Sequence, residues 1–371
     1  MNMPEAVCLV AGAGIGGGVM ALPCLVAGAG FWPSVLIMLF AYGITVVLHI
    51  MVAELSIRTE YSSELLTIFT RHLFRGSKAL RSVFYALMAV TLICNLAAYI
   101  TGAGDIIADL LGIPIIIAEI VFFICAAAVV FLGLKRIAIN EAVTLAVMLA
   151  FLAYLVIVTF TLPAHQSFAS ARWEPSPLLA VYGMAMFSLS SLFAVPQAAS
   201  GLRGEKKRLT IAVAAGLLIN LAVMVIITLS VLLSSDPVTE VAIVGWAAAL
   251  GGSTRIFGSL FIALAMLGTF WSISLQLSDM TREYFKSGQI IAWLLATSPS
   301  FLLALLPVSG FLGLMQIAGG ATAVVVACMA VPAYRNAISG ADGLLLGNMG
   351  KGRLLCGSIM VMYLLMAIAS L

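Results

Sequence analysis

Long apolar runs, separated by short polar stretches, dominate the pattern along this chain. A run of about 18 or more largely apolar residues is long enough to cross a bilayer as a helix. Eleven such runs are present, the ninth being short, with cores at Pro4 to Ala29, Phe31 to Ile57, Ser82 to Gly102, Leu110 to Leu134, Ile137 to Leu162, Leu178 to Ala199, Leu209 to Leu233, Ile256 to Leu277, Ile290 to Leu306, Phe311 to Val331 and Leu354 to Leu371. The pattern predicts an all-α polytopic membrane protein with eleven transmembrane helices, forming a single domain over residues 1–371.

The first run is interrupted by five glycines between Gly12 and Gly18. Each glycine costs a helix interior about 1 kcal/mol relative to alanine, so five together favour unwinding. Lipid offers no partner for freed backbone groups, which must therefore face protein or a wet cavity. The cluster predicts a broken helix with a binding site at the break, an arrangement typical of secondary transporters that hold a small zwitterion at the bilayer midplane.

The same letters also fit a dinucleotide-binding G-x-G-x-x-G turn. That interpretation requires an acidic residue about 20 positions after the glycines, and the first acid downstream is Glu54. Composition decides between the two, because 63% of residues are hydrophobic, 9% are charged and the mean hydropathy is +1.19. Soluble domains carry roughly 25% charged residues. A soluble dinucleotide-binding enzyme is therefore excluded, and three scattered histidines without H-E-x-x-H give no support for a membrane enzyme.

Loop lengths suggest an internal repeat. The two long connections, Arg58 to Arg81 and Ser234 to Arg255, lie five runs apart and therefore on opposite faces. An inverted five-plus-five repeat has this property, with one copy over residues 4–162, the second over 175–331 and an extra C-terminal helix over 354–371. It predicts a second break in the sixth run, where the chain reads FSLSSLFAVPQ from Phe187 to Gln197. Serines compete with the helix ladder there, and Pro196 removes a donor.

Basic residues predict the orientation. Sixteen of the eighteen lysines and arginines fall in loops after even-numbered runs, and only Arg172 and Arg255 lie on the other face. By the positive-inside rule the N-terminus is cytoplasmic and the C-terminus external, in the cell inner (plasma) membrane. The net charge of +3 is spread over short loops, so nucleic acid is not an expected partner, whereas the lipid bilayer is. The sequence does not indicate the oligomeric state.

The motif GAGIGGGVMALP, followed by AELSIRT, resembles the G-(S/T)-x-(I/V)-G-x-G-x-x-x-L-P signature of amino acid permeases of the amino acid/polyamine/organocation superfamily. The hydroxy and aromatic amino acid permeases and the amino acid/auxin permeases are the most similar branches. FSLSSLFAVPQ is similar to F-A-L-S-G-F-E-V-I-P-E, and GTFWSISLQLSD to T-S-F-L-G-V-S-L-G-L-F-D, with departures at Ser191, Phe193, Gln197 and Gly268-Thr269. The resemblance implies a leucine-transporter-like fold with discontinuous helices 1 and 6. It also implies secondary active transport of a neutral amino acid, aromatic or hydroxylated, by alternating access.

The two breaks provide candidate substrate contacts. Free N–H groups at the start of a half-helix suit a carboxylate, and we assign Gly14, Ile15, Gly16, Gly17 and Gly18 to that role. Carbonyl groups of Ala11 to Ala13 and residues Phe187, Ser188 and Ser190 would hold the α-ammonium group. Candidates for side-chain selectivity are Asn95, Tyr99, Ser191, Leu192, Phe193, Trp271 and Ser274. Structural alternatives stay open: the glycines can serve close helix packing, Tyr99 and Asn95 can be interfacial or structural, and Trp271 can be core.

The coupling ion is the remaining question. In this fold sodium is typically held by carbonyls at the first break and hydroxyls on the eighth run, here Ala11, Gly14, Thr269 and Ser272. The most similar branch is mostly proton-coupled, so a proton symporter is favoured over a sodium symporter or a transporter-fold nutrient sensor. No metal site and no cofactor are expected. For Glu119 and His49 a structural role is favoured, and Glu54, Glu141 and Asp279 are expected to form ion pairs beside basic loops.

Overall fold

The computed structural model describes residues 1–62, 64–132, 137–161, 173–235, 237–306, 310–339 and 343–370, without the side chains of 129–148, 252–254, 257, 260, 261, 264 and 265. All regular structure in these residues is helical. In chain order the helices are α1 Met3–Gly14, α2 Gly17–Ala29, α3 Phe31–Arg58, α4 Leu65–Phe69, η1 Thr70–Phe74, α5 Lys78–Leu111, α6 Ile115–Leu132, α7 Ile137–Thr161, α8 Pro175–Ser188, α9 Ala194–Gly201, α10 Lys206–Ser234, α11 Ala242–Leu250, α12 Gly252–Phe285, α13 Gln289–Leu305, α14 Phe311–Val325, η2 Val326–Ala330, α15 Val331–Ala337, η3 Gly347–Lys351 and α16 Arg353–Ala369.

Four continuous stretches of the described chain are long and apolar enough to cross a membrane. They are α3, α5, α10 and the run Phe311–Ala337, which joins α14, η2 and α15. Helices α1 and α2 pass the same test together, as one span bent by 54°. Shorter apolar helices, including α13 and α16, account for other predicted runs. The all-helical membrane architecture is confirmed, while the count of eleven spans stays a prediction.

Two predicted runs are longer in the structure than their apolar cores. Helix α5 continues to Leu111 and ends at Gly112, whose φ of 66° is the left-handed conformation that glycine adopts readily. Asp105 and Asp109 lie on its last turns, so polarity alone did not end the helix. Helix α12 likewise begins at Gly252 and reaches Phe285, well beyond the predicted Ile256 to Leu277. A polar side chain leaves the backbone hydrogen bonds of a helix intact, so the apolar core of a run underestimates its length.

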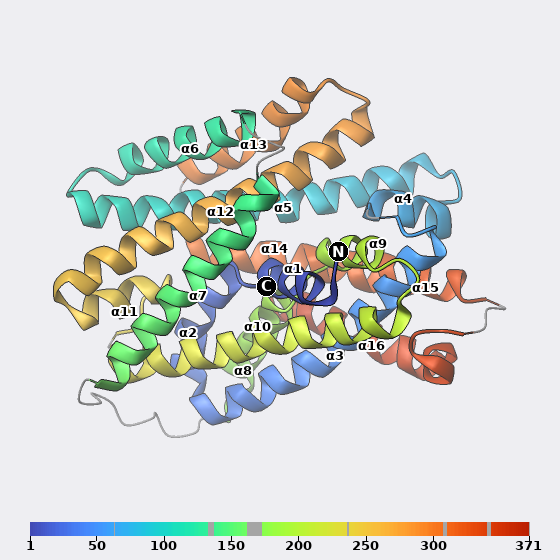
Figure 1. Ribbon diagram of the computed structural model, residues 1–371, viewed down its shortest axis with the longest axis horizontal. Coiled ribbons are helices and arrows are strands. Elements are labelled where there is room, and N and C mark those ends of the chain that lie inside the picture. Colours follow the sequence, from blue (N-terminus) through green and yellow to red (C-terminus); the bar gives the residue numbers. More distant parts are fainter. Residues whose placement is uncertain are drawn as a thin grey trace.

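Both long connections contain short helices. Helix α4 and the π-helical turn η1 occupy the first, and α11 occupies the second. Phe69 and Phe74 are buried against Phe84 of α5, with Phe69 and Phe84 in edge-to-face contact at 5.0 Å between ring centroids. Trp246 of α11 is fully buried and donates from its indole N–H to the Thr159 hydroxyl of α7 at 2.7 Å. Helices α4 and α11 lie at opposite ends of the long helices (Figure 1).

The broken first span lies within the bundle. Helix α1 packs on α10, α2 packs on α8, and α3 packs on α8, α9 and α10. Helices α12 and α14 both pack on α5. Large apolar side chains on the outer surface, such as Trp32, Leu36 and Phe40 of α3, are more than half exposed. An apolar outer surface of this kind matches contact with lipid.

Candidate functional site

The first span breaks where the glycines predict it. Helix α1 ends at Gly14, and the Ile15 N–H donates to the carbonyls of Ala11 and Gly12, each at 3.2 Å. The Gly16 N–H donates to the Gly14 carbonyl at 3.0 Å, and α2 begins at Gly17. The predicted discontinuity is therefore confirmed. Of the five residues assigned to a carboxylate, Gly14 is the last residue of α1, and the Ile15 and Gly16 N–H groups have partners within the break. Gly17 and Gly18 are the first residues of the second half-helix.

The sixth span is also discontinuous, as predicted. Helix α8 ends at Ser188 and α9 begins at Ala194, with Leu189 to Phe193 between them. The Ser190 N–H donates to the Phe187 carbonyl at 2.9 Å, which closes a tight turn at the end of α8. Pro196 lies in the first turn of α9, where its missing N–H removes no bond of the helix. The proline therefore marks the start of the second half of this span.

The two breaks touch each other. A Cβ atom on Gly18 would collide with the Ser188 hydroxyl and lie 3.2 Å from the Ser188 Cα, so only glycine allows α2 to approach α8 this closely. A Cβ atom on Gly14 would collide with the side-chain amide of Asn220 from α10. That amide donates to the Ser188 carbonyl at 2.8 Å. Asn220 thus joins the ends of α1 and α8 from a third helix.

Three further helices surround the start of α2. Tyr99 of α5 is 2% exposed, and its hydroxyl accepts the Gly17 N–H at 2.7 Å. A Cβ atom on Gly16 would lie 2.7 Å from that hydroxyl and 3.7 Å from the Thr269 methyl group of α12, while Gly17 faces the Met315 sulfur of α14. The structure therefore brings Tyr99 and Thr269 to the first break, as the sequence analysis expects. It gives Tyr99 a specific backbone partner at the first residue of α2.

His49 of α3 forms a hydrogen bond with the second break. Its Nδ1 lies 2.7 Å from the Thr45 carbonyl, and its Nε2 accepts the Ser191 N–H at 2.8 Å. The Ser191 hydroxyl in turn donates to the Val10 carbonyl of α1 at 2.9 Å. His49 and Ser191 are 0% and 1% exposed. The favoured structural role of His49 is supported, and both polar groups of Ser191 serve this network, although the sequence analysis assigned Ser191 to side-chain selectivity.

Other predicted contacts have local partners. The Asn95 amide donates to the Thr91 carbonyl at 3.2 Å, one turn back on its own helix, and the Ser274 hydroxyl donates to the Trp271 carbonyl at 3.1 Å. Phe187 packs on Gly319 of α14. Ala13 lies in the last turn of α1, and Leu192 and Phe193 lie within the second break. The Ser272 side chain of α12 forms no hydrogen bond with the described residues of either break. The carbonyls of Ala11 and Gly14 accept the backbone bonds given above.

The predicted ion pairs form where the side chains are described. Glu54, 1% exposed, lies 2.7 Å from Arg58 and also accepts the Leu345 N–H at 2.8 Å. Asp279 lies 3.3 Å from Arg282, and the side chain of Glu141 is outside the described residues. Glu119 of α6 is buried where a Cβ atom on Gly104 of α5 would collide with it. Glu54 and Asp279 therefore each pair with an arginine about one turn further along the same helix.

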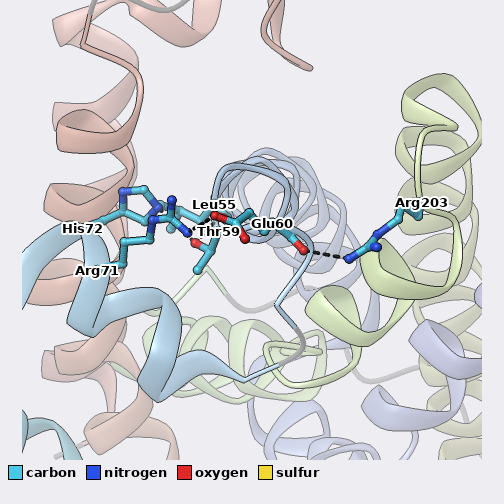
Figure 2. A network of polar contacts seen from close by, with 6 residues as sticks. All are labelled: Leu55, Thr59, Glu60, Arg71, His72 and Arg203. Atoms are coloured by element: carbon cyan, nitrogen blue, oxygen red, sulfur yellow. Dashed lines mark hydrogen bonds and ion pairs between the residues drawn. The ribbon is translucent and has the colours of Figure 1, made fainter.

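A polar network at the end of α3 joins three segments (Figure 2). The Thr59 hydroxyl lies 3.0 Å from Nε2 of His72 and donates to the Leu55 carbonyl at 2.7 Å. Glu60, at a left-handed φ of 56°, pairs with Arg71 at 2.9 Å, and its carbonyl accepts from Arg203 at 2.9 Å. Burial, reinforced by the charges of Arg71 and Arg58, lowers the pKa of His72 below its ordinary value of 6.5. The network ties the turn after α9 to the turn after α3.

Asn220 is the residue that the sequence analysis did not single out. It is fully buried, and its Oδ1 has no hydrogen-bond partner among the described residues. A buried amide oxygen without a partner is uncommon and costs free energy. The available signal was a single asparagine within an otherwise apolar stretch, LLINLAV. Such residues in spanning helices usually serve function or helix association.

Two interrupted helices that meet inside an apolar bundle define a membrane transporter of the class that uses broken helices. A model of the tryptophan/tyrosine permease family matches residues 2–367, and the chain belongs to that family. "Glutamine transporter 2" of Aliivibrio fischeri is 22% identical over 324 residues, which cover 84% of this chain and 83% of that protein.

Solved transporter structures share the fold. A manganese transporter of Eremococcus coleocola, crystallised with an aromatic bis-isothiourea compound, matches 99% of this chain and 85% of its own with a TM-score of 0.67 and 16% identity. Mhp1, a nucleobase-cation-symport-1 family transporter in a closed conformation with bromovinylhydantoin, matches 99% of this chain and 89% of its own with a TM-score of 0.64 and 11% identity. The family and these relatives are transporters, and the chain is a multi-span transporter of an amino acid permease family.

Proposed function

We propose that the chain is a secondary active symporter of a neutral amino acid that works by alternating access. The observation that carries this proposal is the meeting of the two breaks, where Gly18 packs on Ser188 and where Asn220 contacts Gly14 and donates to the Ser188 carbonyl. Exposed backbone at membrane depth is stable only within protein or along a cavity. Two such segments in contact supply both a positive and a negative set of backbone groups, which suits a zwitterion.

The substrate carboxylate would lie at the start of α2. The Gly17 N–H is already donated to the Tyr99 hydroxyl, so the Gly18 N–H and the Tyr99 hydroxyl are the groups that would meet the carboxylate. A hydroxyl that accepts one bond still has its own proton to donate. Tyr99 would therefore donate its hydroxyl proton to the carboxylate. The bond from the Gly17 N–H to its oxygen makes this hydroxyl a stronger donor. This role extends the assignment of Tyr99 to a contact common to every amino acid.

The ammonium group would face the carbonyl ends of α1 and α8. Those ends carry the negative pole of each half-helix. The Ser188 carbonyl already accepts from Asn220, and a carbonyl oxygen can accept a second bond. The partly exposed Phe187, Ser190 and Phe193 lie at the same break and are our candidates for contact with the substrate side chain. The family description supports an aromatic substrate, and the relative described as a glutamine transporter supports a neutral one.

The topology is part of the proposal. We assign eleven spans, an inverted five-plus-five repeat, a cytoplasmic N-terminus, an external C-terminus and a plasma membrane location. Helix pairing supports the repeat: α1 packs on α10 as α8 packs on α3, and α2 packs on α10 as α9 packs on α3. In both comparisons the second contact follows from the first when α1 is exchanged with α8, α2 with α9 and α10 with α3. The positions of α4 and α11 at opposite ends of the bundle agree with this inversion (Figure 1).

For the coupling ion we favour the proton, with sodium as the alternative. The sodium site would use Ala11, Gly14, Thr269 and Ser272, and Thr269 does lie beside Gly16. The test is uptake of labelled tryptophan, tyrosine, serine and glutamine into proteoliposomes at fixed pH, with sodium or with choline. Accumulation without sodium that collapses when the proton gradient is dissipated supports proton symport. Loss of uptake in choline supports sodium coupling, and binding without accumulation would identify a sensor.

A further inference from the structure

A basic hollow lies away from the two breaks, lined by residues of α15 and α16 and by Arg75. Helix α15 lies at the same end of the bundle as α4 (Figure 1). Its volume is about 380 Å³, within the range of small-molecule sites. The polar residues that line it are Arg75, Arg335, Arg353, Asn336 and Ser339. The other lining residues include the apolar Val331, Pro332 and Met360.

The three arginines come from three different segments, one of them far from the other two in the sequence. Arg75 follows η1, Arg335 lies on α15, and Arg353 begins α16. Phe74, the residue before Arg75, is buried against Phe84, and this contact fixes the position of the chain at Arg75. The Asn336 amide donates to the His72 carbonyl at 3.0 Å, which fixes α15 against η1. The hollow is thus a product of tertiary packing.

None of these arginines is neutralised within the described chain. The five ion pairs found there involve other arginines, and no carboxylate of the described residues lies within 4.0 Å of Arg75, Arg335 or Arg353. Like charges around one hollow repel each other, and an anion between them would replace that repulsion with attraction. A guanidinium group presents paired N–H donors that match phosphate oxygens.

We propose that this hollow binds the phosphate headgroup of an anionic phospholipid. Its position beside α16 favours a lipid over a soluble phosphate ester, because α16 presents a strongly exposed apolar surface, with Leu354 87% and Val361 58% exposed. Acyl chains can lie along this surface while the headgroup enters the hollow. Basic pockets between helices at the cytoplasmic surface recognise anionic headgroups in this way. The bound lipid would hold η1, α15 and α16 together, independently of which substrate is carried.

The test is thermal unfolding of delipidated full-length protein titrated with phosphatidylglycerol or with phosphatidylcholine. The wild type should gain more stability from phosphatidylglycerol, with a lower half-saturating concentration. The double variant R335Q/R353Q should weaken that apparent affinity about 25-fold, since each arginine near a membrane surface contributes about fivefold. The variant K207Q/K286Q, which removes two exposed basic residues outside the hollow, should keep the wild-type titration.

Each outcome bears on the proposal. An unchanged phosphatidylglycerol titration for R335Q/R353Q, with the lipid-free melting temperature of the wild type, overturns it. Equal loss in both double variants reduces the effect to general surface charge and also overturns it. Soluble glycerol phosphate is the third arm: if it stabilises the wild type at the concentrations at which the lipid does, the ligand is a free phosphate ester. Because unfolding is measured without substrate, a failure of the proposed transport activity does not alter these results.

Discussion

Replacing His49 by leucine should loosen the break in the sixth span. The imidazole has a backbone partner on each nitrogen, with the Thr45 carbonyl at Nδ1 and the Ser191 N–H at Nε2. A carbonyl only accepts and an N–H only donates, so the ring is neutral, with its proton on Nδ1. Leucine fills a similar volume and offers no acceptor. The Ser191 N–H is then left without its partner in a buried position.

The magnitude follows from that single group. A buried donor left unsatisfied costs about 1–3 kcal/mol. The Thr45 carbonyl adds little, because it lies inside α3 and keeps its helical hydrogen bond. Since about 1.4 kcal/mol corresponds to a factor of ten, the population in which the break is open should rise about 5- to 150-fold.

Hydrogen exchange measures this population directly. Peptides that cover residues 187–195 should exchange faster in His49→Leu by the same factor, while peptides from α13 should be unchanged. His49→Gln is the matched control, because its side-chain oxygen can reach the place of Nε2 and accept from Ser191. It should retain most of the protection. Wild-type exchange at the break in His49→Leu would refute the reasoning, as would equal acceleration in both variants.

Three further predictions concern other parts of the site. Gly18→Ala should destabilise the protein by about 1–3 kcal/mol in denaturant titrations, because the new Cβ atom meets the Ser188 backbone, whereas Gly28→Ala, with open space around it, should not. Tyr99→Phe should weaken amino acid binding about 10- to 100-fold by calorimetry, the value of a lost hydrogen bond to a charged group; an unchanged dissociation constant would exclude contact with the carboxylate. His72 has a lowered pKa, so the unfolded chain takes up its proton first, and stability should be lost as pH falls below about 6.5. Melting temperatures across this pH range should depend less on pH in His72→Gln, and an identical profile would contradict the assignment.

The positions of both breaks could be predicted from local sequence. Five glycines favour unwinding wherever they occur, and the serines before Pro196 compete with the helix ladder in the same way. Their effect depends on the backbone of the same few residues. Helix α1 accordingly ends at Gly14 and α8 ends at Ser188, within the predicted stretches. Local conformational preference was sufficient for this part of the fold.

The partners of the polar residues could not be predicted, because they lie far away along the chain. Ser191 and His49 are separated by 142 positions, and Asn220 and Ser188 by 32. From sequence, a serine in a break is free to face the substrate. In the structure its hydroxyl and its N–H both serve other helices. Hydrophobic periodicity identifies which residues are inside a bundle, but it contains no information on which buried polar groups meet.

The glycine cluster illustrates the division between packing and binding. Asn220 and Ser188 leave no space for a side chain at Gly14 and Gly18, so larger residues at these positions should destabilise the fold. At Gly16 and Gly17 the nearest atoms are side-chain tips, the Tyr99 hydroxyl and the Met315 sulfur, and not backbone.

Replacing Gly16 or Gly17 with valine should therefore leave the protein folded, with a near-normal melting temperature, while substrate binding is lost because the side chain covers the start of α2. Normal uptake by both valine variants would show that all these glycines serve helix packing alone. A loss of uptake with intact folding at Gly16 and Gly17, and a loss of folding at Gly14 and Gly18, would assign both roles within one motif.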